Sequence, residues 1–225
     1  MHVVVNAAMS ADGKLSSRRR EQIKISGSED FERVDQLRAD SDAVMVGVGT
    51  VLADDPSLTV DETDLLPQSG DGTPRHPARV VADSRARTPL DARIVDDAAT
   101  TYLLVSDAAP AERVEALSAT DAEIVTAGER RTDLDAALDA LEAAGIEQLM
   151  VEGGGELIYS LFAADLVDEL IVFVGPTVIG GRDAPTLADG EGFVDEFPAL
   201  QLDSIERMDG GVLLRWSVPV NEPNS

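Results

Sequence analysis

The chain has 225 residues, of which 44% are hydrophobic and 27% charged, a composition typical of a globular protein with an apolar core. It has no cysteine and only two histidines, which excludes a disulfide scaffold and a cysteine nucleophile and leaves no metal site to expect. No apolar run reaches the roughly 18 residues that a membrane-spanning helix needs, and the N-terminus lacks the basic stretch of a signal peptide. We therefore expect a cytoplasmic protein without a membrane partner.

Acidic residues dominate the charge. Asp and Glu number 43 against 18 Lys and Arg, which gives a formal net charge of −25. A field this negative repels nucleic acids and anionic lipids, so neither is an expected partner. Only two of the basic residues are lysines, Lys14 and Lys24. An acidic interaction protein is one interpretation, but the composition favours a halophilic protein, because molar salt screens charge repulsion beyond about 3 Å.

The first half of the chain alternates apolar runs with polar connections. Strands are predicted at 3–8, 43–48, 79–82 and 101–105. The Ser26–Glu29 segment fits a capping box and predicts a helix that continues to Arg38. The apolar face of this helix would consist of Phe31, Val34 and Leu37.

The second half predicts more helices and strands and ends on a hairpin. Helices are predicted at 110–117 and 157–164, and a third between a cap at Thr132–Asp135 and a C-terminal glycine, Gly145. Strands are predicted at 123–126, 148–151 and 168–174. Two final apolar runs, 200–206 and 212–218, flank Met208-Asp209-Gly210-Gly211, which is a hairpin signal.

This order of elements predicts an α/β fold. Strands that alternate with helices are typical of a mostly parallel central sheet, and the hairpin adds an antiparallel edge. We expect a single domain over 1–225. Residues 61–77, a polar stretch with several prolines and glycines, would form a surface insertion, and 219–225 a tail.

The Glu152-Gly153-Gly154-Gly155-Glu156 run follows a predicted strand and opens a predicted helix. Glycines there let the backbone approach a ligand closely, and the free N–H groups of a helix N-terminus attract an anion. The alternative is a tight strand-to-helix turn without a ligand. Three consecutive glycines exceed what such a turn requires, so the run favours a phosphate-binding site.

Two other runs also follow predicted strands. Gly47-Val48-Gly49-Thr50 begins like a dinucleotide-binding fingerprint but lacks the third glycine, and a turn before a short helix ending ahead of Pro56 explains it equally well. The run from Asn6 to Leu15 carries an Asp-Gly turn and Lys14. A solvated lysine in a turn is the simpler interpretation of that run.

In this order, the motifs resemble those of the riboflavin-biosynthesis reductases. They are Asn-x-x-x-Ser-x-Asp-Gly-Lys from Asn6, Gly-x-Gly-Thr-Val-x-x-Asp-Asp-Pro-x-Leu-Thr from Gly47, Val-Val-x-Asp-Ser from Val80, and Glu-Gly-Gly from Glu152. The resemblance covers roughly residues 2 to 218. It extends to the free-standing archaeal reductases of 2,5-diamino-6-(ribosylamino)-4(3H)-pyrimidinone 5′-phosphate and to the reductase half of the bacterial deaminase–reductases. Asn6 fits the archaeal branch, because the bacterial branch carries Lys there.

The resemblance implies a dihydrofolate-reductase-like fold with helices on both faces of the sheet, a bound NADPH and a homodimer. It implies that Thr50 and Asp54 line the nicotinamide or its ribose. The residues implied to hold the cofactor's phosphates are Ser84, Gly153, Gly154, Gly155, Glu156 and Leu157. It also implies a cis peptide bond between Gly153 and Gly154.

The resemblance places Asn6 and Glu152 on the substrate side and Arg38 at the phosphate of the substrate. Related sequences often carry an arginine shortly after Leu-Thr, where this chain has Asp61. Lys24 stands where the bacterial branch has Trp. We hypothesise that Lys24 supplies the missing positive charge.

The implied reaction converts a ribosylamino group into a ribitylamino group. Hydride adds to C1′ of the ring-opened imine, and Asp54 or Glu152 would stabilise the cationic imine. The choice between NADPH and NADH depends on charge beside the adenosine ribose, for which Arg85 and Arg87 are candidates. Two other functions remain open: a nucleotide-binding protein without turnover on the same fold, and a dihydrofolate reductase, whose tryptophan-rich folate site this chain lacks.

Overall fold

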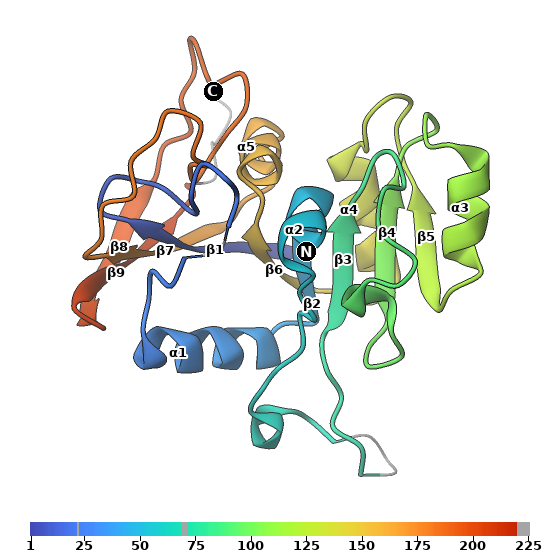
Figure 1. Ribbon diagram of the computed structural model, residues 1–225, viewed down its shortest axis with the longest axis horizontal. Coiled ribbons are helices and arrows are strands. Elements are labelled where there is room, and N and C mark those ends of the chain that lie inside the picture. The colour runs from blue at the N-terminus through green and yellow to red at the C-terminus, as the bar shows by residue number, and fades with distance from the viewer. Residues whose placement is uncertain (22, 69–71, 220–225) are drawn as a thin grey trace, which may run out of the picture.

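The computed structural model describes residues 1–21, 23–68 and 72–219, which form a single nine-stranded sheet in the order β5-β4-β3-β2-β6-β1-β7-β9-β8 (Figure 1). The strands are β1 His2–Ser10, β2 Ala43–Gly47, β3 Ala78–Ala82, β4 Thr101–Val105, β5 Ala122–Thr126, β6 Gln148–Gly153, β7 Glu169–Gly175, β8 Gln201–Met208 and β9 Gly211–Ser217. The helices are α1 Ser28–Ala39, α2 Val48–Asp54, α3 Ala111–Ser118, α4 Leu134–Ala143 and α5 Gly155–Ala163, with 3₁₀ turns η1 Thr63–Leu65 and η2 Arg93–Val95.

The sheet is mostly parallel, as predicted. Strands β1 to β7 pair in parallel, and β9 and β8 complete the sheet in antiparallel orientation. The chain builds β2 to β5 outward on one side and then returns to insert β6 between β2 and β1. Ligands of open parallel sheets bind at the carboxyl ends of the strands where the strand order reverses. The carboxyl ends of β2, β6 and β1 are therefore where a site is expected.

Helices cover both faces of the sheet, also as predicted. Alternate residues of each central strand face different hydrophobic clusters. On one face Val5 packs in a cluster with Leu138 of α4 and Ile158 of α5. On the other face Val44 and Met150 pack in a cluster that includes residues of α1, α2 and α3. In Figure 1, α1 and α5 lie on opposite sides of β1 and β6.

Helix α1 buries different side chains from those predicted. Phe31 is 52% exposed, whereas Asp30 and Asp35 are buried. Val34 and Leu37 do pack against the core. The inner face of α1 is therefore partly polar, because its carboxylates and arginines meet polar partners on the sheet and in a following loop.

The predicted capping box at the start of α1 is wrong. Gly27 is the N-cap residue and has no side chain to accept a hydrogen bond. The carboxylate of Asp209 accepts instead from the N–H groups of Gly27 at 3.0 Å, Asp30 at 2.9 Å and Glu29 at 3.4 Å. Gly27 and Asp209 are 182 residues apart, so no local pattern could reveal this cap.

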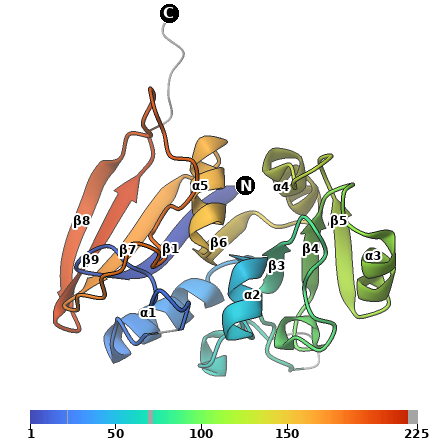
Figure 2. The same cartoon turned by 45° about the horizontal axis from the view of Figure 1, so that its top comes forward.

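The C-terminal hairpin forms as predicted. Asp209 and Gly210 both have positive φ, 48° and 73°, which suits a two-residue turn between twisted strands. Strand β8 is the outermost strand of the sheet in Figure 2, and its Leu202 and Ile205 are 49% and 63% exposed. An uncovered edge strand of this kind is a surface on which another chain can pair.

The remaining predicted helices and strands are present, with ends that differ by one or two residues. Residues 61–77 connect α2 to β3 over the surface, with mostly exposed side chains and Leu66 buried. Residues 69–71 of this insertion, and 220–225 of the predicted tail, lie outside the described residues.

Candidate active site

Strand β6 contains an irregularity at Glu152. Met45 of β2 pairs with Val151, but the next residue, Val46, pairs with Gly153. Glu152 is therefore an extra residue in β6. A β-bulge of this kind redirects a side chain and is common beside active sites.

The redirected Glu152 forms a two-pronged ion pair with Arg38 in the last turn of α1. Arg38 Nε donates to Oε1 at 2.5 Å, and Nη2 donates to Oε2 at 2.7 Å. Arg38 Nη1 also donates to the carbonyl oxygen of Thr59 at 2.9 Å. Burial opposes the charge of Arg38, but the carboxylates of Glu152, Asp35 and Asp61 together outweigh it, so the pKa of the Arg38 guanidinium lies above its ordinary value.

A second ion pair lies earlier on α1, against β1. Arg33 Nε and Nη2 donate to Oδ1 of Asp30 at 2.9 and 2.7 Å, and Nη2 also donates to Oδ1 of Asn6 at 2.8 Å. Asn6 and Asp30 are 6% and 2% exposed. Sequence reasoning missed Arg33 and Asp30. The only signal was a pair of opposite charges three positions apart, which is also typical of a solvated helix face.

A second buried carboxylate on α1, Asp35, holds the chain that follows α2. It accepts from the N–H groups of Asp61 at 2.9 Å and Glu62 at 2.6 Å. Asp61 also contributes to the raised pKa of Arg38. The structure thus places a carboxylate near Arg38 where the resemblance leads us to expect a second cation.

The fold favours glycine at Gly154 and at Gly155 for different reasons. The peptide bond between Gly153 and Gly154 is trans, so the predicted cis bond is wrong. The chain turns into α5 through the positive φ of Gly154, +96°, at the helix N-cap. A methyl group on Gly155 would lie 2.6 Å from the carbonyl oxygen of Thr186, because that loop packs on the first turn of α5.

Helix α2 faces the same glycine run. A methyl group on Gly153 would lie 3.8 Å from Thr50 Oγ1, so Thr50 borders the run. Asp54 follows Thr50 by four positions and lies on the same side of α2. Desolvation by neighbouring groups raises the pKa of the Asp54 carboxyl above its ordinary value. A side chain at Gly49 would meet open space, so this glycine leaves room beside Thr50.

Glu156 and Leu157 form the first turn of α5, and they differ in exposure. Leu157 is buried in the core, whereas the Glu156 side chain is exposed. Their backbone N–H groups, rather than their side chains, are the groups suited to a phosphate. Gly154 offers no side-chain cap to this helix. An uncapped helix start beside Thr50 and open space at Gly49 fits the phosphate of a nucleotide cofactor.

Ser84 is engaged within the protein. Its hydroxyl accepts from the N–H of Thr132 at 2.9 Å and lies 3.1 Å from the Thr132 hydroxyl, which ties the end of β3 to the start of α4. The preceding Asp83 is fully buried and accepts from the N–H and hydroxyl of Thr88 at 2.7 and 2.8 Å. Arg87 Nε lies 3.9 Å from the other oxygen of Asp83, while the Arg87 side chain is 58% exposed.

Lys24 and Arg38 lie at different ends of α1. Lys24 Nζ is 5.6 Å from the centre of the Phe31 ring, in the first turn of the helix, whereas Arg38 is in the last turn. Phe31 and Arg38 are separated by roughly 10 Å of helix. The structure therefore does not bring the two cations together around one phosphate-sized space.

The loop after β1 is tied to a distant segment. Hydrogen bonds to Asp12 from the Ser10 hydroxyl at 2.6 Å and from the N–H groups of Ile179 and Gly180 at 2.9 and 2.7 Å lower its pKa to about 2. Lys14 Nζ donates to the carbonyl oxygen of Ala184 at 3.1 Å, so Lys14 is not simply solvated as expected. This loop and residues 177–187 border the start of α5 through Thr186, whose backbone pairs with that of Lys14.

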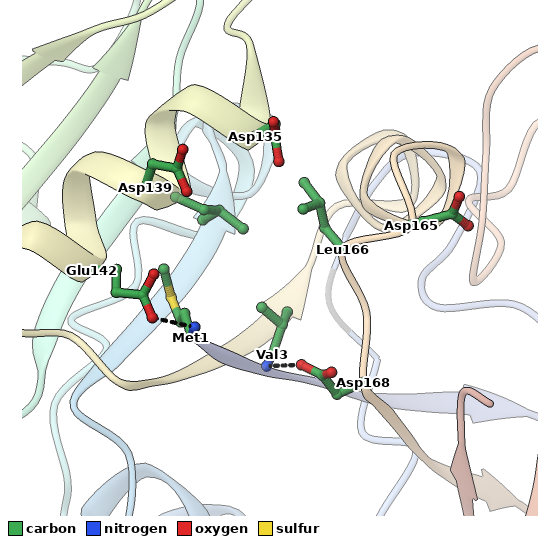
Figure 3. Close-up of a pocket in the computed structure, with 9 residues that line it drawn as sticks. Met1, Val3, Asp135, Asp139, Glu142, Asp165, Leu166 and Asp168 are labelled. Carbon is green, nitrogen blue, oxygen red and sulfur yellow. Dashed lines mark hydrogen bonds and ion pairs between the residues drawn. The ribbon is translucent and has the colours of Figure 1, made fainter. Parts of the chain in front are cut away.

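A hollow of about 160 Å³ lies away from these residues, and Figure 3 shows the side chains that line it. The N-terminal amine of Met1 pairs there with Glu142 at 2.5 Å, and the N–H of Val3 donates to Asp168 at 2.7 Å. The hollow lies at the amino end of β1, and none of the predicted site residues lines it.

Two kinds of feature are absent from residues 1–21, 23–68 and 72–219. Within those residues no group of three or more His, Cys, Asp or Glu side chains is arranged to hold a metal ion. Within the same residues no helix has the length and apolar character needed to cross a membrane.

Residues 1–214 match the family described as RibD C-terminal domain. The chain is 49% identical over 211 residues to a 2,5-diamino-6-ribosylamino-4(3H)-pyrimidinone 5′-phosphate reductase from Archaeoglobus fulgidus, covering 93% of this chain and 94% of that protein. A protein of the same name from Methanothermobacter thermautotrophicus is 49% identical and covers 90% of each chain. In fold, the chain is similar to a pyrimidine reductase-like protein from Corynebacterium diphtheriae, with a TM-score of 0.79, 18% identity, and 98% and 92% of the two chains covered. The chain belongs to the RibD C-terminal domain family.

Proposed function

We propose that the chain reduces the ribosylamino group of 2,5-diamino-6-ribosylamino-4(3H)-pyrimidinone 5′-phosphate to a ribitylamino group, with NADPH as the reductant. The observation that carries this proposal is the 49% identity, over 90% or more of both chains, to two archaeal proteins of that name. The ion pairs Arg38–Glu152 and Arg33–Asp30 support it, because they offer polar groups to a substrate and Glu152 directly precedes the glycine run.

The cofactor residues are those around the start of α5. When bound, NADPH supplies the hydride that adds to C1′ of the opened imine. Thr50 and Asp54 lie along the nicotinamide side. Gly153, Gly154 and Gly155, with the backbone of Glu156 and Leu157, hold the phosphates, and Ser84 contributes from the end of β3.

The two candidate catalytic carboxylates have different tasks in this proposal. Glu152 is paired with Arg38 by both oxygens, so its charge is already partly balanced. Asp54 has no ion pair among those found between described residues. Asp54 therefore stabilises the cationic imine as it forms, and Glu152 orients Arg38 toward the substrate.

NADPH is preferred to NADH in this proposal because Arg85 and Arg87 follow Ser84 and are exposed. Arg87 is drawn toward Asp83, which leaves Arg85 as the freer cation for a 2′-phosphate. Steady-state rates with both cofactors test the preference. A higher kcat/KM with NADPH that Arg85→Ala removes supports it, and equal values for the two cofactors contradict it.

We also propose that the protein is a homodimer that associates through β8. Its Leu202 and Ile205 are exposed on an edge strand, and Phe197 just before the strand is 71% exposed. Light scattering gives the mass directly. A dimeric mass that Ile205→Lys reduces to that of one chain supports this surface, and a monomeric wild type contradicts it.

The halophilic and cytoplasmic assignment rests on the charge of −25. Repulsion among the carboxylates falls as salt screens them, so the melting temperature should rise steeply between 0.1 and about 2 M KCl. Equal melting temperatures at the two salt concentrations would show that the charge has another cause.

The function is tested by measuring the oxidised cofactor and the ribitylamino product in the same high-salt reaction. Purified protein with NADPH and the pyrimidine substrate should oxidise the cofactor and form the ribitylamino product in equal amounts. Binding of both without oxidation indicates a nucleotide-binding protein without turnover, and oxidation with dihydrofolate in place of the pyrimidine indicates a dihydrofolate reductase.

A further inference from the structure

Arg33 has one nitrogen that the chain leaves without a partner. Its Nε and Nη2 are bonded to Asp30 and Asn6, but Nη1 is buried and has no hydrogen-bond partner among the described residues. Buried N–H groups in native proteins are nearly always satisfied by the chain, by water or by a ligand. The Arg33 side chain keeps 13% of its surface exposed, whereas the Nη1 atom itself is buried.

The neighbouring Asn6 is oriented by the same contact. A guanidinium only donates hydrogen bonds, so the atom of Asn6 that faces Arg33 must be the carbonyl oxygen Oδ1. The amide NH₂ of Asn6 therefore points away from Arg33. Together the two residues present donors, and no acceptor, to whatever occupies the space beside them.

The charges around this pair decide which acceptor fits. Arg33 is paired with Asp30 and Arg38 with Glu152, and Asp35 adds a negative charge that binds main-chain N–H groups. The carboxylate of Asp30 therefore balances the charge of the Arg33 guanidinium. A doubly charged phosphate finds no net positive charge at Arg33, whereas a neutral carbonyl oxygen or ring nitrogen takes a hydrogen bond without opposing charge.

We infer that Arg33 Nη1 and the amide NH₂ of Asn6 bind the pyrimidinone ring of the substrate through its neutral acceptor atoms, and that Arg33 thereby selects the ring rather than the phosphate. This inference rests on the proposed function and adds to it a specificity-determining residue. The substrate phosphate then lies away from Arg33 and Asn6, toward other cationic side chains.

The test compares Arg33→Lys with wild type on two substrates, the ribosylaminopyrimidine 5′-phosphate and the same compound without its phosphate. Lysine keeps the charge facing Asp30, but its single nitrogen cannot also replace Nη1. We expect the KM for the pyrimidine to rise about tenfold, with less than a twofold change in the KM for NADPH. The same factor should appear with the dephosphorylated compound, because the lost contact is to the ring.

Two results would overturn the inference in an active enzyme: an unchanged KM, or an effect that disappears when the phosphate is absent. An inactive wild type would overturn the proposed function instead. Asn6→Asp is the second variant, because it keeps an acceptor for Arg33 and replaces the NH₂ donors, and it should raise the same KM. Arg79→Lys is the matched control, a buried arginine far from the site, which should lower the melting temperature and leave the KM unchanged.

Discussion

Two arginines that contact the sheet, Arg79 and Arg33, differ in how fully the chain satisfies their hydrogen bonds. Arg79, at the amino end of β3, is fully buried. Its Nε donates to the Thr101 hydroxyl at 2.9 Å, Nη1 to the carboxylate of Asp96 at 2.6 Å, and Nη2 to the carbonyl oxygens of Asp96 and Ala99 at 2.5 and 2.7 Å. Arg33, on α1 beside β1, has no partner for its Nη1 among the residues that the structure describes.

The difference separates a structural arginine from one suited to a ligand. A guanidinium that is fully buried and whose nitrogens are all bonded within the chain braces the loops around it, and removing it damages the fold. A guanidinium with a spare donor in a polar wall leaves a hydrogen bond for a ligand to complete. Substitution of Arg79 should therefore lower stability, whereas substitution of Arg33 should raise the substrate KM.

The largest expected effect is a loss of stability when Arg79, at the amino end of β3, is replaced. Arg79→Leu leaves the hydroxyl of Thr101 and several carbonyl oxygens without their donor. The free energy of unfolding should fall by about 3 kcal/mol or more. Urea titration in high salt measures it, and an unchanged midpoint would show that the network adds nothing to the fold. The KM of the folded fraction should stay the same.

The next largest expected effect is a loss of turnover when Asp54, at the end of α2, is replaced. Asp54→Asn keeps the shape and removes the charge, so kcat should fall about 10²-fold while the affinity for the cofactor changes less. The ionised form is the active one, and desolvation raises the pKa of Asp54. The wild-type kcat should therefore decline as the pH falls through a value above the ordinary one, and Asp54→Asn should lack this decline. A loss confined to cofactor binding would make Asp54 a ribose ligand only.

The substrate phosphate provides a third comparison, between Arg38 and Lys24. Arg38→Ala should raise the KM for the substrate by about 10- to 100-fold, because a charge-assisted hydrogen bond contributes about 1.5–3 kcal/mol. Lys24→Ala should raise it less, since Lys24 is exposed. Their separation along α1 predicts that the two effects add in the double variant. Unchanged kinetics in both single variants would remove them from the substrate site.

The smallest effect concerns the cap that holds α1 in place. Asp209→Ala leaves the N–H groups of Gly27 and Asp30 without their acceptor, and should lower the free energy of unfolding by about 0.5–2 kcal/mol. Asp209→Asn, which keeps an acceptor oxygen, should lose less. Equal losses in the two variants would mean that the charge of the carboxylate, and not its hydrogen bonds, stabilises the helix.

The sequence predicted the architecture well, because hydrophobic periodicity and turn residues report local structure directly. The helix caps at Asp133 and Gly145 and the turn at Asp209-Gly210 are local signals, and all three appear in the structure. The cap on α1 is not local, and the prediction failed there. Phe31 was expected inside on spacing alone, yet the polar partners of α1 turned Asp30 inward instead.

The candidate site was predicted only where a motif existed. Glu152, Arg38 and Asn6 came from the resemblance, and the structure joins Glu152 to Arg38 directly. No sequence motif marks Arg33, because its role depends on a hydrogen bond from α1 to Asn6 of β1, which residue types alone do not reveal. The bulge at Glu152 and the trans bond at Gly153 depend on strand register and backbone angles, which residue types alone do not determine.

The most direct test of the central claim measures the substrate KM of Arg33→Lys and Arg79→Lys side by side, with their melting temperatures, in about 2 M KCl, where the halophilic interpretation expects the fold to be stable. The account predicts a KM about tenfold higher for Arg33→Lys with a small change in melting temperature, and an unchanged KM with a lower melting temperature for Arg79→Lys. Equal KM values for the two variants would contradict the claim that the unsatisfied arginine marks the substrate site.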